Sequence, residues 1–100
     1  MSKVRLEFLS WLANGLGVNG KNEEVILASI EVDSTVRDLF NQLVIKYPHF
    51  GQFVFEVKAQ KLNEGVNIFL NGSLLELFNG LQTKLKDGDI LTMVPTIVGG

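Results

Sequence analysis

Cysteine is absent from the 100 residues of this sequence. Its absence excludes a disulfide framework, a cysteine-ligated metal site and a cysteine nucleophile. Histidine is nearly absent as well, since only His49 is present. It follows Pro48 and has no pair of acidic residues beside it, so we interpret it as a solvated loop residue rather than a metal ligand or a catalytic base. We therefore expect no bound metal and no catalytic site in the chain itself.

An excess of charge of one sign is also missing. The formal net charge is −2, and the basic residues are spread along the chain among acidic ones. A nucleic-acid surface needs clustered Lys and Arg that release phosphate counterions, so no nucleic-acid partner is expected. No apolar stretch approaches the roughly 20 residues that span a bilayer, and the N-terminus lacks the pattern of a signal peptide. We predict a soluble, cytoplasmic protein that does not bind membranes.

The composition is that of a globular protein, with 46% apolar and 20% charged residues. A chain of this length is the size of one ordinary domain and buries a core without metal or disulfide support. No internal repeat, low-complexity stretch or linker divides it. We predict one folded domain over residues 1–95, followed by a flexible tail over residues 96–100.

Two strands are predicted in the first third of the chain. Val4, Leu6 and Phe8 alternate with polar residues, which is the period of a half-buried strand. Residues 24–32 predict a second strand. The intervening residues 14–22 are rich in glycine and asparagine, which turn tightly without strain, so the two strands form a hairpin with a long loop.

A helix follows the second strand. Ser34 or Thr35 is placed to accept a hydrogen bond from a free N–H of the first turn, and Asp38 is placed to complete a capping box with Thr35. Pro48 ends the helix, because it lacks an N–H and biases the residue before it away from helical dihedrals. The apolar stripe at helical spacing consists of Val36, Leu39, Phe40, Leu43, Val44 and Tyr47.

Short strands are predicted in the remainder of the domain. Residues 66–70 alternate and precede Asn71-Gly72, the strongest short hairpin signal, so residues 73–77 are expected to form a short partner strand. Residues 90–94 predict the last strand, stopped by Pro95. Residues 53–58 are either a short strand or irregular, and residues 60–65 are expected to form a loop. Asp87 and Asp89 resemble metal ligands, but Asp-Gly favours a turn there.

This order of elements predicts an α+β fold. One main helix must cover one face of a small mixed sheet of four to five strands, because neither buries its apolar side alone. The first and last strands pair in parallel at its centre. This is the ubiquitin-like β-grasp arrangement.

The C-terminal third carries a resemblance. Four features follow one another at the spacing of the ThiS/MoaD family. They are Val66-Asn-Ile-Phe-Leu-Asn-Gly72, Leu81-Gln-Thr-Lys-Leu-Lys-Asp-Gly-Asp89, Pro95 and the terminal Gly99-Gly100. This segment closely resembles the small subunit of molybdopterin synthase and its relatives. These are the sulfur carriers of thiamine and cysteine synthesis and the archaeal ubiquitin-like modifiers.

The resemblance implies the chemistry of the tail. In that family an E1-like enzyme adenylates the carboxylate of the last glycine, here Gly100, at the expense of ATP. Sulfide then replaces AMP, and the resulting thiocarboxylate donates sulfur inside a partner such as the large subunit of molybdopterin synthase. The carrier itself binds no cofactor. In the modifier branch the activated carboxyl group acylates a lysine instead.

The composition of the tail suits that role. Gly99 and Gly100 lack Cβ and so fit a narrow channel beside a nucleotide. Ordering the tail costs roughly 1–2 kcal/mol per residue of backbone entropy. Ile97 and Val98, which follow Thr96, offset this cost by burying apolar area and by favouring extension through their β-branches.

Strand alternation also predicts a partner surface. If Leu91 and Met93 point into the core, Val94 points out, and by the same rule Phe69 points out of the neighbouring strand. Phe69 and Val94, with Pro95 beside them, would then form an exposed apolar patch of the kind that marks interfaces. The alternative is that Phe69 is buried under a loop or in a dimer contact.

Three functions are compatible with this sequence. The first is a sulfur carrier, most simply for molybdopterin, although the thiamine, cysteine and tRNA-thiolation pathways use the same scaffold. The second is a covalent protein modifier attached to lysines through Gly100. The third is a non-covalent interaction module whose tail is only a docking peptide.

Overall fold

The computed structural model describes residues 2–8 and 25–95 of the chain. Five strands form one mixed sheet in the order β2-β1-β7-β5-β6. Their bounds are β1 Ser2–Phe8, β2 Val25–Ile30, β5 Val66–Leu70, β6 Ser73–Leu74 and β7 Ile90–Pro95. Strand β1 runs antiparallel to β2 and parallel to β7, whereas β5 is antiparallel to both β7 and β6. The predicted parallel pairing of the first and last strands is therefore confirmed.

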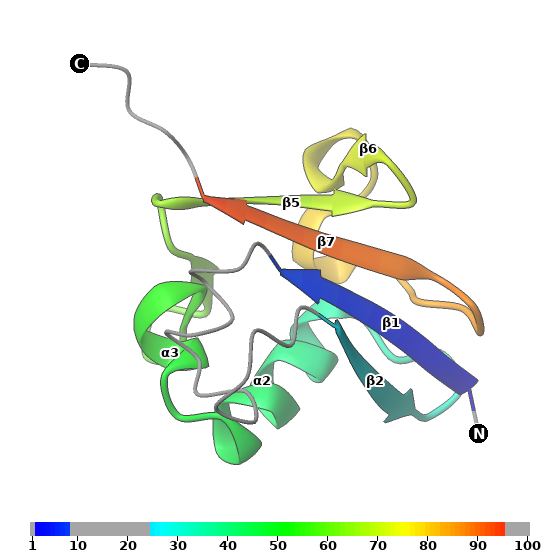
Figure 1. Ribbon diagram of the computed structural model, residues 1–100, viewed down its shortest axis with the longest axis horizontal. Coiled ribbons are helices and arrows are strands. Elements are labelled where there is room, and N and C mark those ends of the chain that lie inside the picture. Colours follow the sequence, from blue (N-terminus) through cyan, green and yellow to red (C-terminus); the bar gives the residue numbers. More distant parts are fainter. Residues whose placement is uncertain (1, 9–24, 96–100) are drawn as a thin grey trace.

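Helix α2, Val36–Lys46, lies against one face of this sheet (Figure 1). The Thr35 side chain accepts a hydrogen bond from the backbone N–H of Asp38 at 3.2 Å, and the Asp38 carboxylate accepts one from the backbone N–H of Thr35 at 3.0 Å. This is the predicted capping box, with Thr35 rather than Ser34 as the cap. The helix ends before Pro48, because the following Tyr47 already has non-helical dihedrals and donates its N–H to Leu43 O.

The core lies between the sheet and α2. Alternate residues of the strands face the helix, as the period-two patterns predicted, and four residues of the helix stripe meet them. The buried residues from these elements are Val4, Leu6, Phe8, Ala28, Ile30, Val36, Leu39, Phe40, Leu43, Val66, Ile68, Leu70, Leu91 and Met93. Val44 and Tyr47 pack at the margin of this cluster. The fold is the predicted α+β, ubiquitin-like β-grasp.

The segment between α2 and β5 agrees with the prediction in part: residues 53–58 contain a short strand, whereas the helix before it and the second strand in residues 60–65 were not predicted. It forms a short helix α3, Phe50–Phe53, and a separate two-stranded sheet of β3, Phe55–Glu56, and β4, Lys61–Leu62. The reason is aromatic packing. Phe50 and Phe55 are both buried and meet Phe40 of α2 edge to face, with ring centroids 5.0 and 5.8 Å apart.

The turn after β5 is a hairpin, as predicted. Asn71 and Gly72 have φ values of 51° and 89°, the left-handed pair that a type I′ turn requires. The partner strand is shorter than the predicted residues 73–77, since only Ser73–Leu74 pair with β5. Leu75 then turns into the core, and the chain continues as two 3₁₀ turns, η1 Leu75–Leu77 and η2 Gly80–Gln82.

Two strand ends also differ from the prediction. Strand β2 ends at Ile30 rather than at residue 32, because Asp33 has a φ of 66° and Ser34 N donates to Glu31 O in a turn. Strand β7 includes Pro95 instead of stopping before it, with Pro95 opposite Val66 in the register. A proline at the last position of a strand interrupts no further pairing. The predicted domain boundary between residues 95 and 96 stays a prediction.

Candidate functional site

The predicted reactive tail follows directly on β7. Its residues Thr96, Ile97, Val98, Gly99 and Gly100 lie outside the described residues. Their predicted roles therefore stay predictions. What the structure does describe is the strand that leads into the tail, which lies between β1 and β5 in the sheet (Figure 1).

The face of the sheet opposite α2 holds the predicted partner residues. Leu91 and Met93 of β7 are fully buried, whereas Thr92 and Val94 alternate with them and are partly exposed. Phe69 of β5 is opposite Thr92 in the register. Phe69 and Val94 are therefore diagonal neighbours on one face, a relationship that corresponds to about 7–8 Å in an antiparallel pair. The structure brings these two residues together as predicted.

Phe69 and Val94 are less exposed than predicted, since each side chain is partly buried. Pro95 follows Val94 as the last residue of β7. The predicted role of all three in binding a partner stays a prediction.

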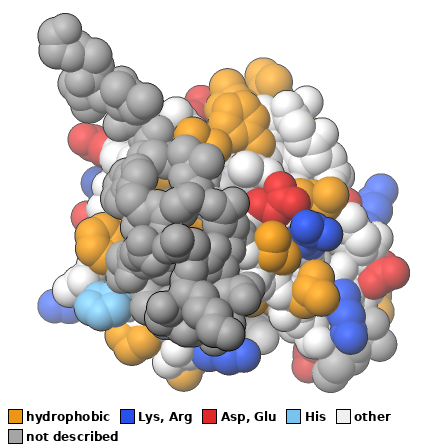
Figure 2. Space-filling view, in the orientation of Figure 1, with side chains coloured by type: hydrophobic (Ala, Val, Ile, Leu, Met, Phe, Trp, Pro, Cys, Tyr) orange, Lys and Arg blue, Asp and Glu red, His pale blue; other side chains and the backbone are white. Residues whose placement is uncertain are grey.

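Leu74 extends this apolar surface and was not singled out in the sequence. It is opposite Phe69 in the β5–β6 register and is partly exposed. The sequence feature that could have identified Leu74 is the two-residue turn at Asn71-Gly72, because such a turn fixes which residues of the two strands are opposite each other. We call Phe69, Leu74, Thr92 and Val94 the outer sheet patch. Figure 2 shows hydrophobic side chains gathered over the region of β5 and β6.

A charged row borders the outer sheet patch. Glu7 of β1 is level with Thr92 in the parallel register. Its carboxylate lies 3.0 Å from Nε of Arg5, two residues earlier on the same face of the strand. Both side chains are partly exposed, so the ion pair contributes little to stability. It instead gives this face a polar margin, which is the usual composition around an interface core.

The two carboxylates of the loop before β7 hold the backbone. Asp87 Oδ1 accepts a hydrogen bond from Lys3 N at 2.8 Å, and Asp89 Oδ2 accepts one from Lys86 N at 2.8 Å. The preferred interpretation of these residues as a turn is confirmed. His49 Nδ1 lies 2.9 Å from Gln52 Oε1 at the start of α3. In the described part of the chain no three His, Asp or Glu side chains are grouped as metal ligands.

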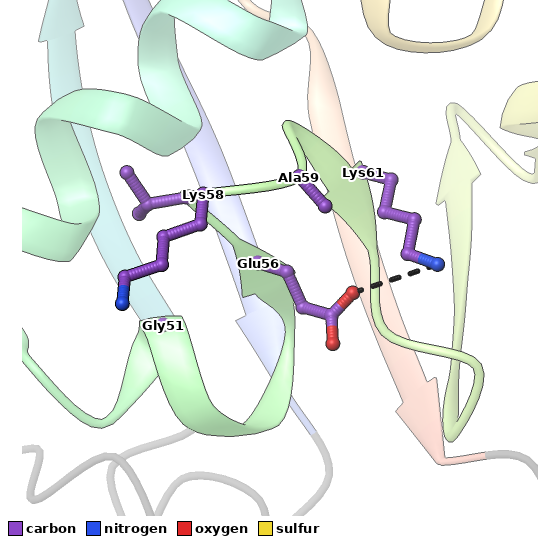
Figure 3. Close-up of a pocket in the computed structure, with 6 residues that line it drawn as sticks. Gly51, Glu56, Lys58, Ala59 and Lys61 are labelled. Carbon is purple, nitrogen blue, oxygen red and sulfur yellow. Dashed lines mark ion pairs between the residues drawn. The ribbon is translucent and has the colours of Figure 1, made fainter.

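A depression of about 510 Å³ lies elsewhere (Figure 3). It is lined by Gly51, Glu56, Val57, Lys58, Ala59 and Lys61. Glu56 and Lys61 point toward one another across β3 and β4, with Nζ and Oε2 3.9 Å apart, and both side chains are about half exposed. An open, solvated ion pair of this kind stabilises little. We assign it no chemical role.

Among the described residues, no helix has the length and apolar character needed to cross a membrane.

Comparison with known proteins identifies the family. The model of the ThiS family matches residues 16–100, which include the outer sheet patch and both terminal glycines. The chain belongs to the ThiS family. This membership confirms the predicted resemblance to the ThiS/MoaD sulfur carriers.

Individual relatives agree with this assignment. A proposed sulfur carrier protein of Archaeoglobus fulgidus is 38% identical over 40 residues, which cover 40% of this chain and 46% of the relative. The chain thus matches less than half the length of that relative. The solution structure of small archaeal modifier protein 1 of Methanosarcina acetivorans is 28% identical with a TM-score of 0.76, covering 100% of this chain and 98% of that one.

A more distant structure shows the same fold. A proposed molybdopterin converting factor subunit 1 of Pyrococcus furiosus is 22% identical with a TM-score of 0.71, covering 97% of this chain and 100% of that one. At this identity the likeness establishes the fold alone.

Proposed function

We propose that this chain is a sulfur carrier that bears its cargo as a thiocarboxylate on Gly100. The observation that supports this proposal is the ThiS-family match over residues 16–100, because it extends through Gly99 and Gly100. In this proposal the reactive group is the tail carboxylate, which a separate enzyme must activate.

The proposed reaction has two steps. The Gly100 carboxylate attacks the α-phosphate of ATP on an E1-like enzyme, and pyrophosphate leaves to give the acyl adenylate. Hydrogen sulfide ion then attacks the carbonyl carbon, and AMP leaves with release of one proton. The product is the thiocarboxylate, a better nucleophile than the carboxylate. Because the first step consumes ATP, we propose that the reaction takes place in the cytoplasm.

The fold contributes position rather than chemistry. Strand β7 is paired by β1 as far as Met93 and by β5 as far as Pro95, so the sheet holds the strand from which the tail begins. We propose that the outer sheet patch docks the activating enzyme and the sulfur acceptor, while residues 96–100 enter the partner's active site. Burial of Ile97 and Val98 there offsets the entropy lost on ordering the tail.

The acceptor that we propose is the large subunit of molybdopterin synthase. The C-terminal sequence pattern supports this pathway. Sulfur carriers of thiamine synthesis, cysteine synthesis and tRNA thiolation share the scaffold and are the alternatives. Each of these alternative pathways differs from the molybdopterin pathway in the acceptor enzyme and not in the activation step.

Intact mass spectrometry tests the carrier function. The purified chain is incubated with its cognate E1-like enzyme, ATP and sulfide. We expect a gain of about 16 Da, the difference between sulfur and oxygen, and its loss when ATP is omitted. Absence of both the adenylate and the mass gain refutes the proposal and leaves the non-covalent docking module. Addition of the large subunit and its precursor then tests the pathway through formation of molybdopterin.

One relative favours a second function. The Methanosarcina acetivorans structure is named a small archaeal modifier protein and is 28% identical over the whole chain. In this alternative the activated Gly100 forms an amide bond with a lysine of another protein, and AMP leaves. Tryptic remnants of this chain on lysines of other proteins, which would comprise residues 87–100 because Lys86 is the last tryptic site, would support the modifier. Their absence in cells that accumulate the thiocarboxylate would support the carrier.

A further inference from the structure

Strand β2 forms an edge of the main sheet and carries few of the features that protect such edges. Its sequence Val25-Ile-Leu-Ala-Ser-Ile30 has no charge and no proline. Within residues 2–8 and 25–95, no strand pairs with β2 on the side away from β1 (Figure 1). Edge strands usually carry lysine, proline or a bulge, because an unpaired row of N–H and C=O groups recruits another strand.

The hydrogen bonds of β1 show which groups of β2 face that open edge. Lys3 is opposite Ser29, yet the Lys3 N–H donates to Asp87 Oδ1 and its carbonyl accepts from Gly88 N. Arg5 is opposite Leu27, and the Arg5 N–H donates to Asp89 O on the same far side. Because backbone groups alternate in direction along an antiparallel strand, those of Leu27 and Ser29 point away from β1.

One side chain already contacts this edge. Gln42 of α2 donates from Nε2 to Ser29 O at 3.4 Å. This distance is longer than the usual 2.7–3.2 Å for an N–H···O bond. The bond is therefore weak, and the amide of an incoming strand would replace it at little cost.

A groove runs beside the edge, between β2 and α2. It consists of two adjoining depressions of about 480 and 230 Å³ that share Ser29 and Gln42. The larger is lined by Ser29, Ile30, Glu31, Ser34, Asp38 and Gln42. The smaller adds Ile26, Leu27, Ala28, Leu43, Lys46 and Tyr47. We call the two together the β2–α2 groove.

The groove differs in charge between its ends. At the end near Ile30, Glu31 and Asp38 give a negative lining. At the other end, Leu43 and Tyr47 give an apolar lining, and the cationic Lys46 lies beside them. A ligand that fits both ends carries a cationic side chain and, a short distance along the chain, an apolar one. Groove-facing side chains of a strand recur every second residue, at about 6.6 Å.

We propose that the β2–α2 groove binds an extended segment of a partner protein, which adds to β2 as an antiparallel strand. Its backbone pairs with Leu27 and Ser29. Its N-terminal groove-facing residue is a lysine or arginine near Glu31 and Asp38, and the next two groove-facing residues are apolar and lie toward Leu43 and Tyr47. This binding mode is strand addition to an open sheet edge. It is independent of the tail and of the proposed sulfur chemistry.

A synthetic peptide tests the proposal. The probe is acetyl-Lys-Thr-Val-Thr-Ile-Thr-amide, whose threonines would lie opposite Ser29, Leu27 and Val25. It is titrated into the full ¹⁵N-labelled chain. We expect amide shifts centred on residues 25–30, together with slowed exchange of the Leu27 and Ser29 amides. The same peptide N-methylated at its threonines cannot pair with β2, and we expect it to lose binding.

Protein variants test the polarity of the groove. Glu31→Lys should weaken binding about two- to fivefold, the effect of an exposed ion pair. Glu64→Lys makes the same charge change outside the groove and should leave binding unchanged.

Three outcomes overturn the proposal. They are no β2 shift at millimolar peptide, equal binding of the N-methylated peptide, or protection of the β2 amides that rises with protein concentration without peptide. The last outcome would mean that a second copy of the chain occupies the edge.

Discussion

The side-chain amide of Asn71 donates a hydrogen bond of 3.1 Å to Oδ1 of Asp89, and so joins the β5–β6 turn to the loop before β7. Asn71 Oδ1 also accepts a bond from Ile90 N at 2.9 Å, and the Asn71 N–H donates to Ile90 O at 2.8 Å. The Asn-Gly and Asp-Gly-Asp segments that carried the family resemblance are thus in contact. Together they fix the start of the strand that leads to the tail.

Substitution of Asn71 should destabilise the fold. Asn71→Ala removes two side-chain hydrogen bonds and places an alanine at a φ of 51°. We expect a loss of about 1–3 kcal/mol in the free energy of unfolding, measured by urea denaturation. Asn67→Ala on β5 is the control and should change stability by less than about 0.5 kcal/mol. Equal effects would contradict the role of the Asn71 network.

The helix cap gives a second prediction. Thr35→Ala removes the side chain that accepts from Asp38 N. The loss should be about 0.5–2 kcal/mol, which is typical of a capping residue. Ser34→Ala is the matched control, because the hydrogen bonds described for Ser34 involve only its backbone. A larger effect at Ser34 than at Thr35, seen in thermal or urea unfolding, would mean that the cap is misassigned.

Local patterns were sufficient to predict most of the fold. The alternation of Val66, Ile68 and Leu70, and the Thr35–Asp38 capping spacing, each express one local rule, and both are confirmed. The outer position of Phe69 followed from the same alternation. Leu74 was within reach of the same reasoning, since the Asn71-Gly72 turn fixes its register opposite Phe69.

The segment after α2 was not predictable in this way. Helix α3 is only four residues long, so it leaves no periodic signal. Gln60 has a φ of 52° and exchanges amide hydrogen bonds of 3.0 and 3.2 Å with Asn41 of α2. That contact joins residues 19 apart, and no local rule contains it. The β2–α2 groove was unpredictable for the same reason, because it requires the packing of Gln42 beside Ser29.

The aromatic cluster gives a third prediction. Phe40 meets both Phe50 and Phe55 edge to face. Phe40→Leu keeps the site apolar but removes both aromatic pairs, so we expect a loss of about 1–3 kcal/mol. Phe53→Leu is the control, because Phe53 is 38% exposed and should change stability by less than about 0.5 kcal/mol. Urea unfolding of the two variants side by side decides whether the cluster anchors α3 to α2.

The outer sheet patch gives a fourth prediction, which depends on the proposed function. Phe69→Ser removes the central aromatic ring of the patch while the inner face of β5 stays intact. We expect affinity for the sulfur-acceptor enzyme, measured by calorimetry, to fall about tenfold or more. Ile45→Ser on α2 is the control, since Ile45 is 85% exposed and lies outside the sheet. Unchanged affinity of Phe69→Ser would remove the patch from the interface.

Deletion of Gly100 separates the chemistry from the fold. The buried cluster of the described residues extends no further along the chain than Met93. The truncated chain should therefore keep its Tm within about 2 °C. When it is incubated with the E1-like enzyme, ATP and sulfide, it should also fail to gain the roughly 16 Da that mark a thiocarboxylate. The reason is that its last carboxyl group lies one residue short of the nucleotide. A folded truncation that is still thiolated at the normal rate would show that Gly100 is not the activated residue. A truncation that unfolds would instead show that the tail belongs to the core.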